Sequence, residues 1–216
     1  RYNDLVDYYT LWVHQIKTPI AASKLLVSEV ADRQLKQQLE QEIFKIDSYT
    51  NLVLQYLRLE SFHDDLVLKK ENIEDLVKEV IRKYAIFFIQ KGLSINLHDL
   101  DRSIVTDKKW LLVVIEQILS NSLKYTNAGG VEIYMDGSDL CIKDTGIGIK
   151  NSDRLRVFER GFSGYNGRMT QQSSGLGLYL TQKISQELGH QIQIESELGQ
   201  GTTVRIKFSE VNLLIE

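Results

Sequence analysis

Cysteine, proline and long apolar runs are all scarce in this chain of 216 residues. Its single cysteine, Cys141, cannot form an internal disulfide, which excludes a disulfide scaffold and suits a reducing compartment. The residues around Cys141 alternate as in a strand, which predicts a buried, unreactive thiol. No apolar run approaches the roughly 18 residues that a membrane-spanning helix needs. Because the chain begins at Arg1 and not at methionine, we expect a longer parent protein with a membrane or sensor segment upstream.

An excess of charge of one sign is also missing. The formal net charge is -3, from 26 lysines and arginines against 29 aspartates and glutamates, and no basic run is present. Nucleic-acid backbones are bound by clustered lysine and arginine, so we expect no nucleic-acid partner. The hydrophobic fraction of 43% predicts a folded chain with one large core or two small ones.

The first 60 residues predict two long helices. Residues 4–30 carry apolar side chains at helical spacing, and a second apolar stripe follows the polar break at residues 31–33. The resulting antiparallel hairpin has apolar faces too large for two helices to cover. We expect two copies to form a four-helix bundle; packing of both stripes on another domain of the same chain is the alternative. The second stripe consists of Leu35, Leu39, Ile43, Ile46, Tyr49, Val53 and Tyr56.

After a linker at residues 61–69, which includes the start of the first strand, strands and helices are mixed. The sequence therefore predicts an α+β fold, with the helical hairpin at residues 1–60 and an α/β sandwich at residues 70–216 that carries helices on one face of a sheet. The predicted helices span residues 73–90, 108–124 and 178–188, and the predicted strands span residues 65–70, 93–97, 131–135, 139–143, 191–195 and 202–208.

Three glycine-rich segments indicate a phosphate-binding site. They are "DTGIGI" (residues 144–149), "SSGLGL" (173–178) and "GQGTT" (199–203), and none has the full spacing of a Rossmann fingerprint. The second precedes a predicted helix, where unhindered backbone N-H groups at the positive helix end can hold phosphate. Residues 156–172 lie between the first two segments and carry glycines with Arg156, Arg160 and Arg168, which predicts a lid over a polyanion.

One face of the predicted helix 108–124 is polar at its end. Gln117, Asn121, Lys124 and Tyr125 follow one another at helical spacing. An amide oxygen is a hard ligand that suits Mg²⁺, a lysine is a point charge for phosphate, and a tyrosine ring is a flat surface for a base. A solvated helix face is the alternative interpretation of each residue taken alone.

In this order, the segments resemble the boxes of the ATP-binding domain of sensor histidine kinases. "EQILSNSLKYT" (116–126), "DTGIGI", "VFERGF" (157–162), "SSGLGL" and "GQGTT" are similar to the N, G1, F, G2 and G3 boxes, and "HQIKTPI" (14–20) resembles the H box upstream. The resemblance covers nearly the whole chain and implies a nucleotide-binding fold of the gyrase/Hsp90/histidine kinase/MutL type. "WVHQIKTPIAA" further resembles the intramembrane-sensing kinases of Gram-positive bacteria that respond to cell-envelope peptides and antibiotics. That implies a place at the cytoplasmic face of the membrane and a partner transporter.

The resemblance implies that the chain binds ATP and Mg²⁺. Asp144 would accept a hydrogen bond from the adenine amino group, Asn121 would bind the metal, and Lys124 and Tyr125 would lie near phosphate and base. The other nucleotide-binding positions that it implies are Gly146, Gly148, Arg160, Gly175, Leu176, Gly177 and Thr203.

For the hairpin, the resemblance implies a homodimer that phosphorylates His14 and passes the phosphoryl group to an aspartate of a response regulator. Thr18, one turn beyond His14, matches the family's position for orienting water during dephosphorylation of the regulator. Gln15 departs from the family, because an acidic residue commonly follows the histidine and an amide cannot take a proton. We therefore list Gln15 with His14 and Thr18 as catalytic candidates, and a phosphatase-dominant dimer with little kinase activity as an alternative.

A second departure concerns Gln117. Related ATPases of the gyrase and MutL type carry at this place a glutamate that activates water, so Gln117 disfavours ATP hydrolysis to solvent, although a water-using ATPase remains the second alternative. Pro19 lacks an N-H for the carbonyl of Gln15, so we expect the helix to bend beside His14. Three other histidines, His63, His98 and His190, have no metal-ligand spacing and are predicted at the surface or in linkers.

Overall fold

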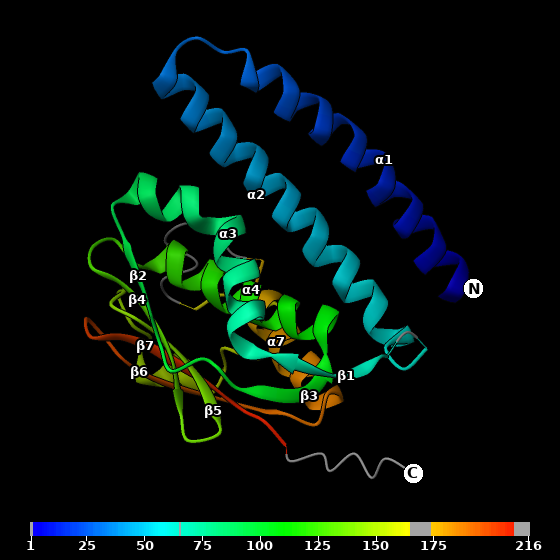
Figure 1. The fold of residues 1–216 in the computed structure, drawn as a ribbon. Helices are drawn as coiled ribbons and strands as arrows, with labels where there is room; N and C mark the ends of the chain where they lie inside the picture. The colour runs from blue at the N-terminus through cyan, green and yellow to red at the C-terminus, as the bar shows by residue number, and fades with distance from the viewer. Residues whose placement is uncertain (1, 65, 165–173, 210–216) are drawn as a thin grey trace. The chain divides into compact units, whose positions relative to one another are not determined.

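The chain divides after Asp64 into two compact units in the computed structural model. The structure describes residues 2–64, 66–164 and 174–209. The first unit is helical and the second is mixed, as the blue-to-cyan and cyan-to-red parts of the ribbon show (Figure 1). Among the described residues, no helix combines the length and the apolar character that crossing a membrane requires.

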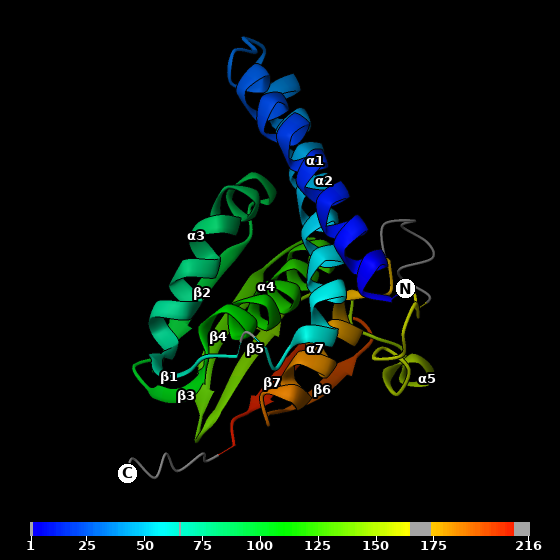
Figure 2. The ribbon, with the colours of Figure 1, turned by 90° about the vertical axis from the view of Figure 1, so that its right-hand side faces the viewer.

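Two antiparallel helices form the first unit (Figure 2). Helix α1 (Tyr2–Ser28) is continuous through Pro19, and α2 (Arg33–Arg58) ends in a short 3-10 turn, η1 (Leu59–Ser61). A proline inside a helix costs one backbone hydrogen bond, which the rest of a helix of 27 residues tolerates. The predicted bend beside His14 stays a prediction.

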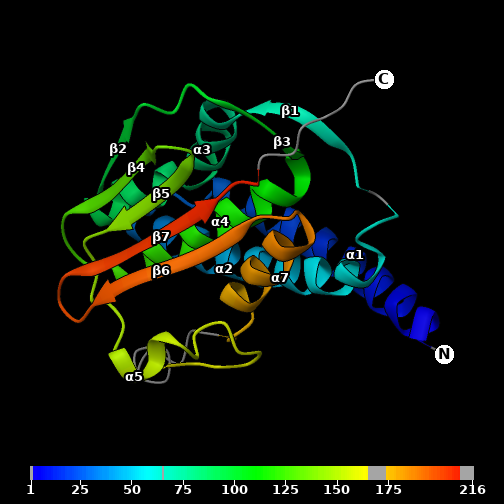
Figure 3. The same cartoon turned by 90° about the horizontal axis from the view of Figure 1, so that it is seen from below.

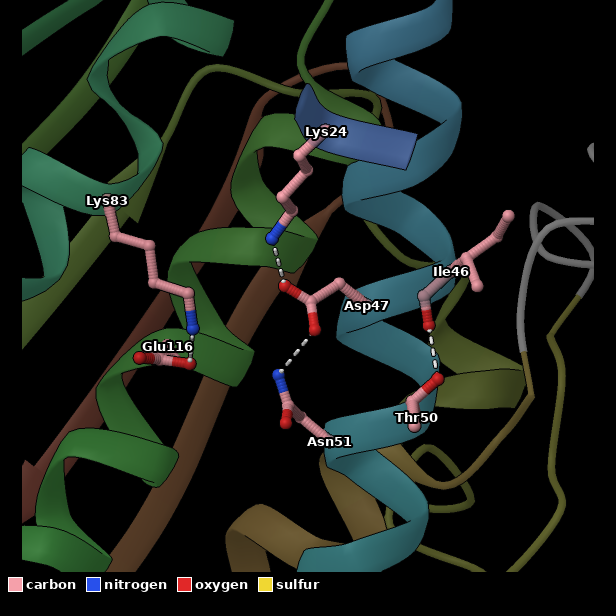
Figure 4. Close-up of polar contacts among 7 residues, drawn as sticks. All are labelled: Lys24, Ile46, Asp47, Thr50, Asn51, Lys83 and Glu116. Carbon is pink, nitrogen blue, oxygen red and sulfur yellow. Dashed lines mark hydrogen bonds and ion pairs between the residues drawn. The ribbon is translucent and has the colours of Figure 1, made fainter. Parts of the chain in front are cut away.

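One polar contact caps the start of α2, and another links α2 to α1. The Asp32 carboxylate accepts a hydrogen bond from the Leu35 amide at 2.9 Å, which satisfies one of the free N-H groups of the first turn. Farther along, Lys24 Nζ of α1 lies 2.7 Å from Asp47 Oδ2 of α2 (Figure 4). This ion pair is a partly exposed polar contact between the two helices.

The hairpin leaves much of its apolar surface uncovered. Val13, Ile20 and Val27, which recur every seven residues along α1, are at most 7% exposed. Other large apolar side chains of both helices are at least 40% exposed, so burial against the partner helix accounts for only part of the apolar surface. These are Tyr9, Leu11, Trp12, Leu25 and Leu26 on α1, and Leu35, Ile46 and Tyr49 on α2.

In the second unit the strands form a two-stranded sheet, β1-β3, and a five-stranded sheet in the order β2-β4-β5-β7-β6. All neighbours are antiparallel except β2 and β4. The strands are β1 (Leu68–Asn72), β2 (Ser94–His98), β3 (Ser103–Asp107), β4 (Gly130–Asp136), β5 (Asp139–Asp144), β6 (Gln191–Glu197) and β7 (Gly201–Lys207).

Helices α3 (Ile73–Lys91), α4 (Lys108–Tyr125) and α7 (Gly177–Glu187) lie on one face of the five-stranded sheet (Figure 3). A short helix, α5 (Asn151–Arg154), lies near the end of β6. Alternate residues of the strands point into the layer between sheet and helices, where apolar side chains exclude water. The core includes Leu76, Val80, Phe88, Trp110, Leu111, Ile115, Leu119, Ile133, Ile142, Leu180, Ile184 and Ile206, each at most 2% exposed.

The predicted α+β fold, with helices on one face of a sheet, is confirmed. Cys141 is fully buried in β5, as expected for an unreactive thiol. His190 lies in the connection between α7 and β6, but the expectation of a surface position was wrong, because its side chain is only 2% exposed and its Nε2 lies 3.2 Å from the Thr106 hydroxyl. Its ring lies against Thr106 of β3 and against the Phe208 ring, whose centre is 5.1 Å away, edge to face.

Candidate functional site

The end of α4 carries the polar face that the sequence predicts. Asp107 caps the start of the helix, and its carboxylate accepts hydrogen bonds from the amides of Trp110 at 3.0 Å and Val67 at 2.8 Å. Its apolar face packs into the core, which leaves the opposite face partly accessible. Gln117, Asn121, Lys124 and Tyr125 are all half-buried on that face.

Lys124 and Tyr125 form a pair at the last turn of α4. Lys124 Nζ lies 4.9 Å from the centre of the Tyr125 ring, a distance at which a cation is attracted to an aromatic face. Burial lowers the pKa of Lys124 to about 8, since the ammonium loses part of its hydration. At neutral pH the group still carries its charge, and a bound anion would restore the interactions that burial removes.

Asp144 ends β5 and is held by three hydrogen bonds. Its Oδ1 accepts from the amides of Gly146 at 2.9 Å and Thr202 at 3.1 Å, and its Oδ2 accepts from the Ser122 hydroxyl at 3.2 Å. The side chain is only 7% exposed, and this burial raises the pKa of Asp144 while the three hydrogen bonds act in the opposite direction. The result is a fixed acceptor in a dry environment.

A second polar group beside Asp144 has no partner. Thr126, directly after α4, is fully buried, and among the residues that the structure describes none forms a hydrogen bond with its Oγ1. A Cβ added at position 146 would lie 3.0 Å from this hydroxyl, 2.8 Å from Asp144 Oδ1 and 2.7 Å from the Tyr125 carbonyl. The missing side chain of Gly146 therefore leaves room between a carboxylate and a donor that has nothing to bind. A buried polar group without a partner is costly unless a ligand or water satisfies it.

Gly148 brings the loop after β5 against the turn between β6 and β7. Its φ is +69°, and a Cβ there would collide with the carbonyl of Glu197. Ser196 closes the same contact, because its hydroxyl accepts from the Ile149 amide at 2.8 Å and donates to the Gly201 carbonyl at 2.8 Å. The first and third glycine-rich segments, residues 144–149 and 199–203, are thus joined by direct contacts at one place in the fold.

The segment "SSGLGL" contributes the start of α7. Gly177 is the first residue of this helix, and a Cβ there would lie 2.9 Å from Gln117 Oε1, so glycine lets the helix end approach the polar face of α4. The first intrahelical bond is donated by Leu180 to Leu176, which leaves the N-H groups before it for other acceptors. Gly175 has a φ of +66°, and its carbonyl accepts from the Gly161 amide at 3.0 Å.

Most of the residues predicted to bind the nucleotide lie around the end of α4 in the second unit. Asn121, Lys124 and Tyr125 share the end of α4, Asp144 at the end of β5 and Gly146 in the loop after it face this helix end, and α7 begins beside it. Thr203 pairs with Lys143 and Glu195 in the sheet, whereas its neighbour Thr202 binds Asp144. Arg160 is exposed just before Gly161, and the remainder of the predicted lid with Arg168 lies outside the described residues.

His14, Gln15 and Thr18 lie on α1 of the other unit. All three side chains are exposed, while their neighbour Val13 is buried. A separation of four residues places His14 and Thr18 on one helix face. Among the described residues, no group of three or more histidine, cysteine, aspartate or glutamate side chains is arranged to hold a metal ion.

Sequence reasoning missed four residues of the second unit. Ser122 and Thr126 flank the predicted polar face but point to Asp144 and Gly146, Thr202 contributes a backbone amide, and Lys91 binds carbonyls at the end of α4. The only sequence signal for these residues was a serine and a threonine at positions that helical spacing places near the core. The sequence carried no signal for the contacts that involve the Thr202 amide or the carbonyls bound by Lys91.

Comparisons with known proteins give a consistent result. Residues 106–212 match the family described as histidine kinase-, DNA gyrase B- and HSP90-like ATPase. The chain is 35% identical over 94% of its length to the sensor histidine kinase YxdK of Bacillus subtilis, and 37% identical over 96% to the sensor protein kinase GraS of Staphylococcus aureus. It spans 64% and 61% of the length of these relatives.

Solved structures share the fold. Full-length ShkA in complex with AMPPNP superposes with a TM-score of 0.66 at 24% identity, covering 93% of this chain and 45% of that one. The histidine kinase AdeS of Acinetobacter baumannii gives a TM-score of 0.63 at 21% identity, covering 92% and 98%.

Proposed function

The chain belongs to the sensor histidine kinases of two-component systems, a family of ATP-dependent protein-histidine kinases, and from this premise we propose that it binds ATP with Mg²⁺ in its second unit and phosphorylates His14. In this proposal residues 1–60 are the dimerisation and phosphotransfer hairpin, residues 61–69 the linker, and residues 70–216 the ATP-binding domain. The observation that carries it is the buried pair of Asp144 and Thr126 on either side of Gly146.

The pair fits an adenine ring. Adenine carries an exocyclic amino donor next to ring-nitrogen acceptors, and Asp144 offers a fixed acceptor while the Thr126 hydroxyl is a donor without a partner. The absent side chain of Gly146 leaves space for a flat ring there. In an apolar surrounding, a site built to pair with such an edge rejects bases that leave its groups unpaired.

The residues beyond this pair fit a phosphate chain. The N-H groups at the start of α7, after Gly175 and Leu176, would bind phosphate oxygens, and Lys124 and Arg160 would supply positive charge. Gly148 and Thr203 belong to the turns that shape the pocket wall. The Asn121 amide oxygen would hold Mg²⁺, which neutralises charge on the phosphates when bound. Gln117 would lie beside α7 as an amide that cannot activate water.

The exposed side chain of His14 suits transfer between proteins. A lone pair of the imidazole would form a bond to the γ-phosphorus as the bond to the bridging oxygen breaks and ADP leaves. The ring nitrogen that does not react then releases its proton, and Gln15 offers it only an acceptor for a hydrogen bond. An aspartate carboxylate of a response regulator would next take the phosphoryl group, which regenerates His14.

The uncovered apolar surface of the hairpin supports a homodimer, in which two hairpins form a four-helix bundle. Within a longer parent protein we place this chain at the cytoplasmic face of the membrane, below a sensor segment and beside a transporter partner. A second candidate function is a phosphatase-dominant dimer. The amide of Gln15 next to His14 favours it, because no carboxylate is there to promote attack.

Incubation with radiolabelled ATP and Mg²⁺ tests the proposal. We expect acid-labile, base-stable phosphate on the wild-type chain, which is lost in His14→Ala and in Asp144→Ala and kept in His63→Ala, whose histidine is exposed elsewhere. Release of inorganic phosphate from ATP that is unaffected by His14→Ala would instead indicate a water-using ATPase.

A further inference from the structure

Lys91 is the last residue of α3 and reaches the end of α4. Its Nζ donates hydrogen bonds to the carbonyls of Leu123 at 2.6 Å and Thr126 at 2.9 Å. The last carbonyls of any helix lack partners within the helix and carry partial negative charge, so a lysine is well suited to bind them. One side chain of α3 thereby holds both the last turn of α4 and the first residue after it.

Two further carbonyls at this helix end also accept hydrogen bonds. The Thr126 amide donates to the Ser122 carbonyl at 3.0 Å, and the Ile147 amide donates to the Tyr125 carbonyl at 3.1 Å. Among the donors to these carbonyls, Lys91 is the one that belongs neither to the end of α4 nor to the loop after β5. It therefore fixes the Tyr125–Thr126 segment from outside the site.

The segment that Lys91 holds is the one that faces Gly146. A Cβ at position 146 would already be 2.7 Å from the Tyr125 carbonyl and 3.0 Å from the Thr126 hydroxyl. The Tyr125–Thr126 segment is therefore packed closely against Gly146. Without Lys91, water would have to satisfy the carbonyls of Leu123 and Thr126, and the segment would lose this link to α3. A segment held less firmly would hold the Thr126 hydroxyl less firmly beside Asp144.

We propose that Lys91 is a positioning residue for nucleotide binding, acting through the carbonyls of Leu123 and Thr126 to place the Thr126 hydroxyl and the Tyr125 ring. This inference rests on the proposed function of the site and adds to it a residue outside the pocket. Because the Lys91 side chain is itself exposed, its bonds are only partly shielded from water, and we expect weakened rather than abolished binding.

The chain offers a matched control in Lys83. This lysine also lies on α3 and also binds α4, since its Nζ is 2.7 Å from Glu116 Oε2 (Figure 4). Lys83 meets α4 two turns before its end and contacts a side chain rather than the final carbonyls. If Lys91 served only to join the two helices, loss of either lysine would have the same consequence.

The test measures ADP binding by calorimetry and autophosphorylation kinetics on the full chain. For Lys91→Met, which keeps the apolar stem, we expect the Kd for ADP and the KM for ATP to rise about five- to tenfold, with kcat at saturating ATP within about twofold of wild type. Lys91→Arg should recover at least half of the lost affinity on a logarithmic scale, because a guanidinium can donate to the same carbonyls. Lys83→Met should leave the Kd unchanged.

Hydrogen exchange supplies a second measurement that does not depend on activity. The amides of residues 123–127 should exchange faster in Lys91→Met than in Lys83→Met, while the helix content of both stays at the wild-type value. An ADP Kd within twofold of wild type in Lys91→Met, beside a wild-type chain that binds ADP and an Asp144→Ala variant that does not, overturns the role of Lys91 and leaves the proposed function standing. A wild-type chain that binds no adenine nucleotide overturns both.

Discussion

The Ser122 hydroxyl of α4 donates to Asp144 Oδ2 at the end of β5 across 3.2 Å. Both groups are buried, and the two residues are 22 positions apart in the sequence. With the amides of Gly146 and Thr202 on the other oxygen, the carboxylate has one orientation. A carboxylate that is already oriented does not have to lose rotational freedom when it binds a base, which favours affinity.

Replacing this hydroxyl should therefore weaken nucleotide binding. We expect Ser122→Ala to raise the Kd for ADP roughly three- to tenfold, which is about 1 kcal/mol and the net value of one ordinary hydrogen bond, because two amides still orient the carboxylate. Calorimetry measures it, and Ser185→Ala is the control, since Ser185 is also a buried helix serine and its Oγ lacks a partner among the described residues. Equal affinities of Ser122→Ala and wild type would contradict a role of Ser122 in orienting Asp144.

Thr126 should show effects of opposite sign in the free and the bound protein. Valine has the same shape without the unpaired hydroxyl, so Thr126→Val should raise the melting temperature of the nucleotide-free chain by about 2–4 °C for each kcal/mol gained. The further rise on adding ADP should shrink, because the hydroxyl no longer meets the base. Thermal unfolding with and without ADP measures both, and an undiminished ADP-induced shift would count against the assignment of this hydroxyl.

Gln15 should limit the rate of phosphorylation of His14. A carboxylate at this position can offset the charge that develops on the imidazole and accept its proton, so Gln15→Glu should raise the initial rate of autophosphorylation several-fold. Gln38→Glu, an exposed substitution on α2, controls for the added charge. An unchanged or lower rate in the radiolabelled assay would show that Gln15 is not the limiting feature.

Thr18 should separate the two activities of the hairpin. Its exposed hydroxyl lies one turn from His14 and is proposed to orient water against a phosphorylated regulator, a step that kinase activity does not use. Thr18→Ala should lose most phosphatase activity and keep autophosphorylation within about twofold. Thr10→Ala on the same helix is the control, and equal loss of both activities in Thr18→Ala would refute the separation.

His190 should make the fold sensitive to acid. Burial lowers its pKa to about 4, whereas the unfolded chain titrates near the ordinary value of about 6.5. Between these values the unfolded state binds more protons, so the free energy of unfolding is largest above about pH 7 and falls as the pH is lowered toward about 4. The group accounts for roughly 2 kcal/mol of this loss between about pH 7.5 and pH 5.

Urea unfolding at several pH values measures the effect. His190→Gln stays neutral and keeps a polar group near Thr106, so its free energy of unfolding should depend less on pH than that of the wild type. His98→Gln changes an exposed histidine and should follow the wild type. A pH dependence of His190→Gln equal to wild type would mean that other groups cause the acid sensitivity.

The sequence by itself determined the helices, the antiparallel hairpin strands and the glycine-rich turns. Helix α3 was predicted at residues 73–90 and spans Ile73–Lys91, and β5 was predicted at residues 139–143 and spans Asp139–Asp144. These features are readable because periodicity and glycine placement express preferences that each short segment has alone. The uncovered apolar surface of the hairpin could be predicted from the same helical periodicity of apolar residues.

Only the tertiary structure decided which distant residues meet. Strand β3 was missed because it is short and pairs with β1, more than 30 residues away, and the burial of His190 was missed because it depends on contacts with the distant Thr106 and Phe208. The Thr202 amide binds Asp144 across 58 positions through the register of β5 and β7, and Lys91 reaches the end of α4 across 35. Such contacts depend on how sheets pair and helices pack, which no local pattern records, and they are the contacts that hold the candidate site in place.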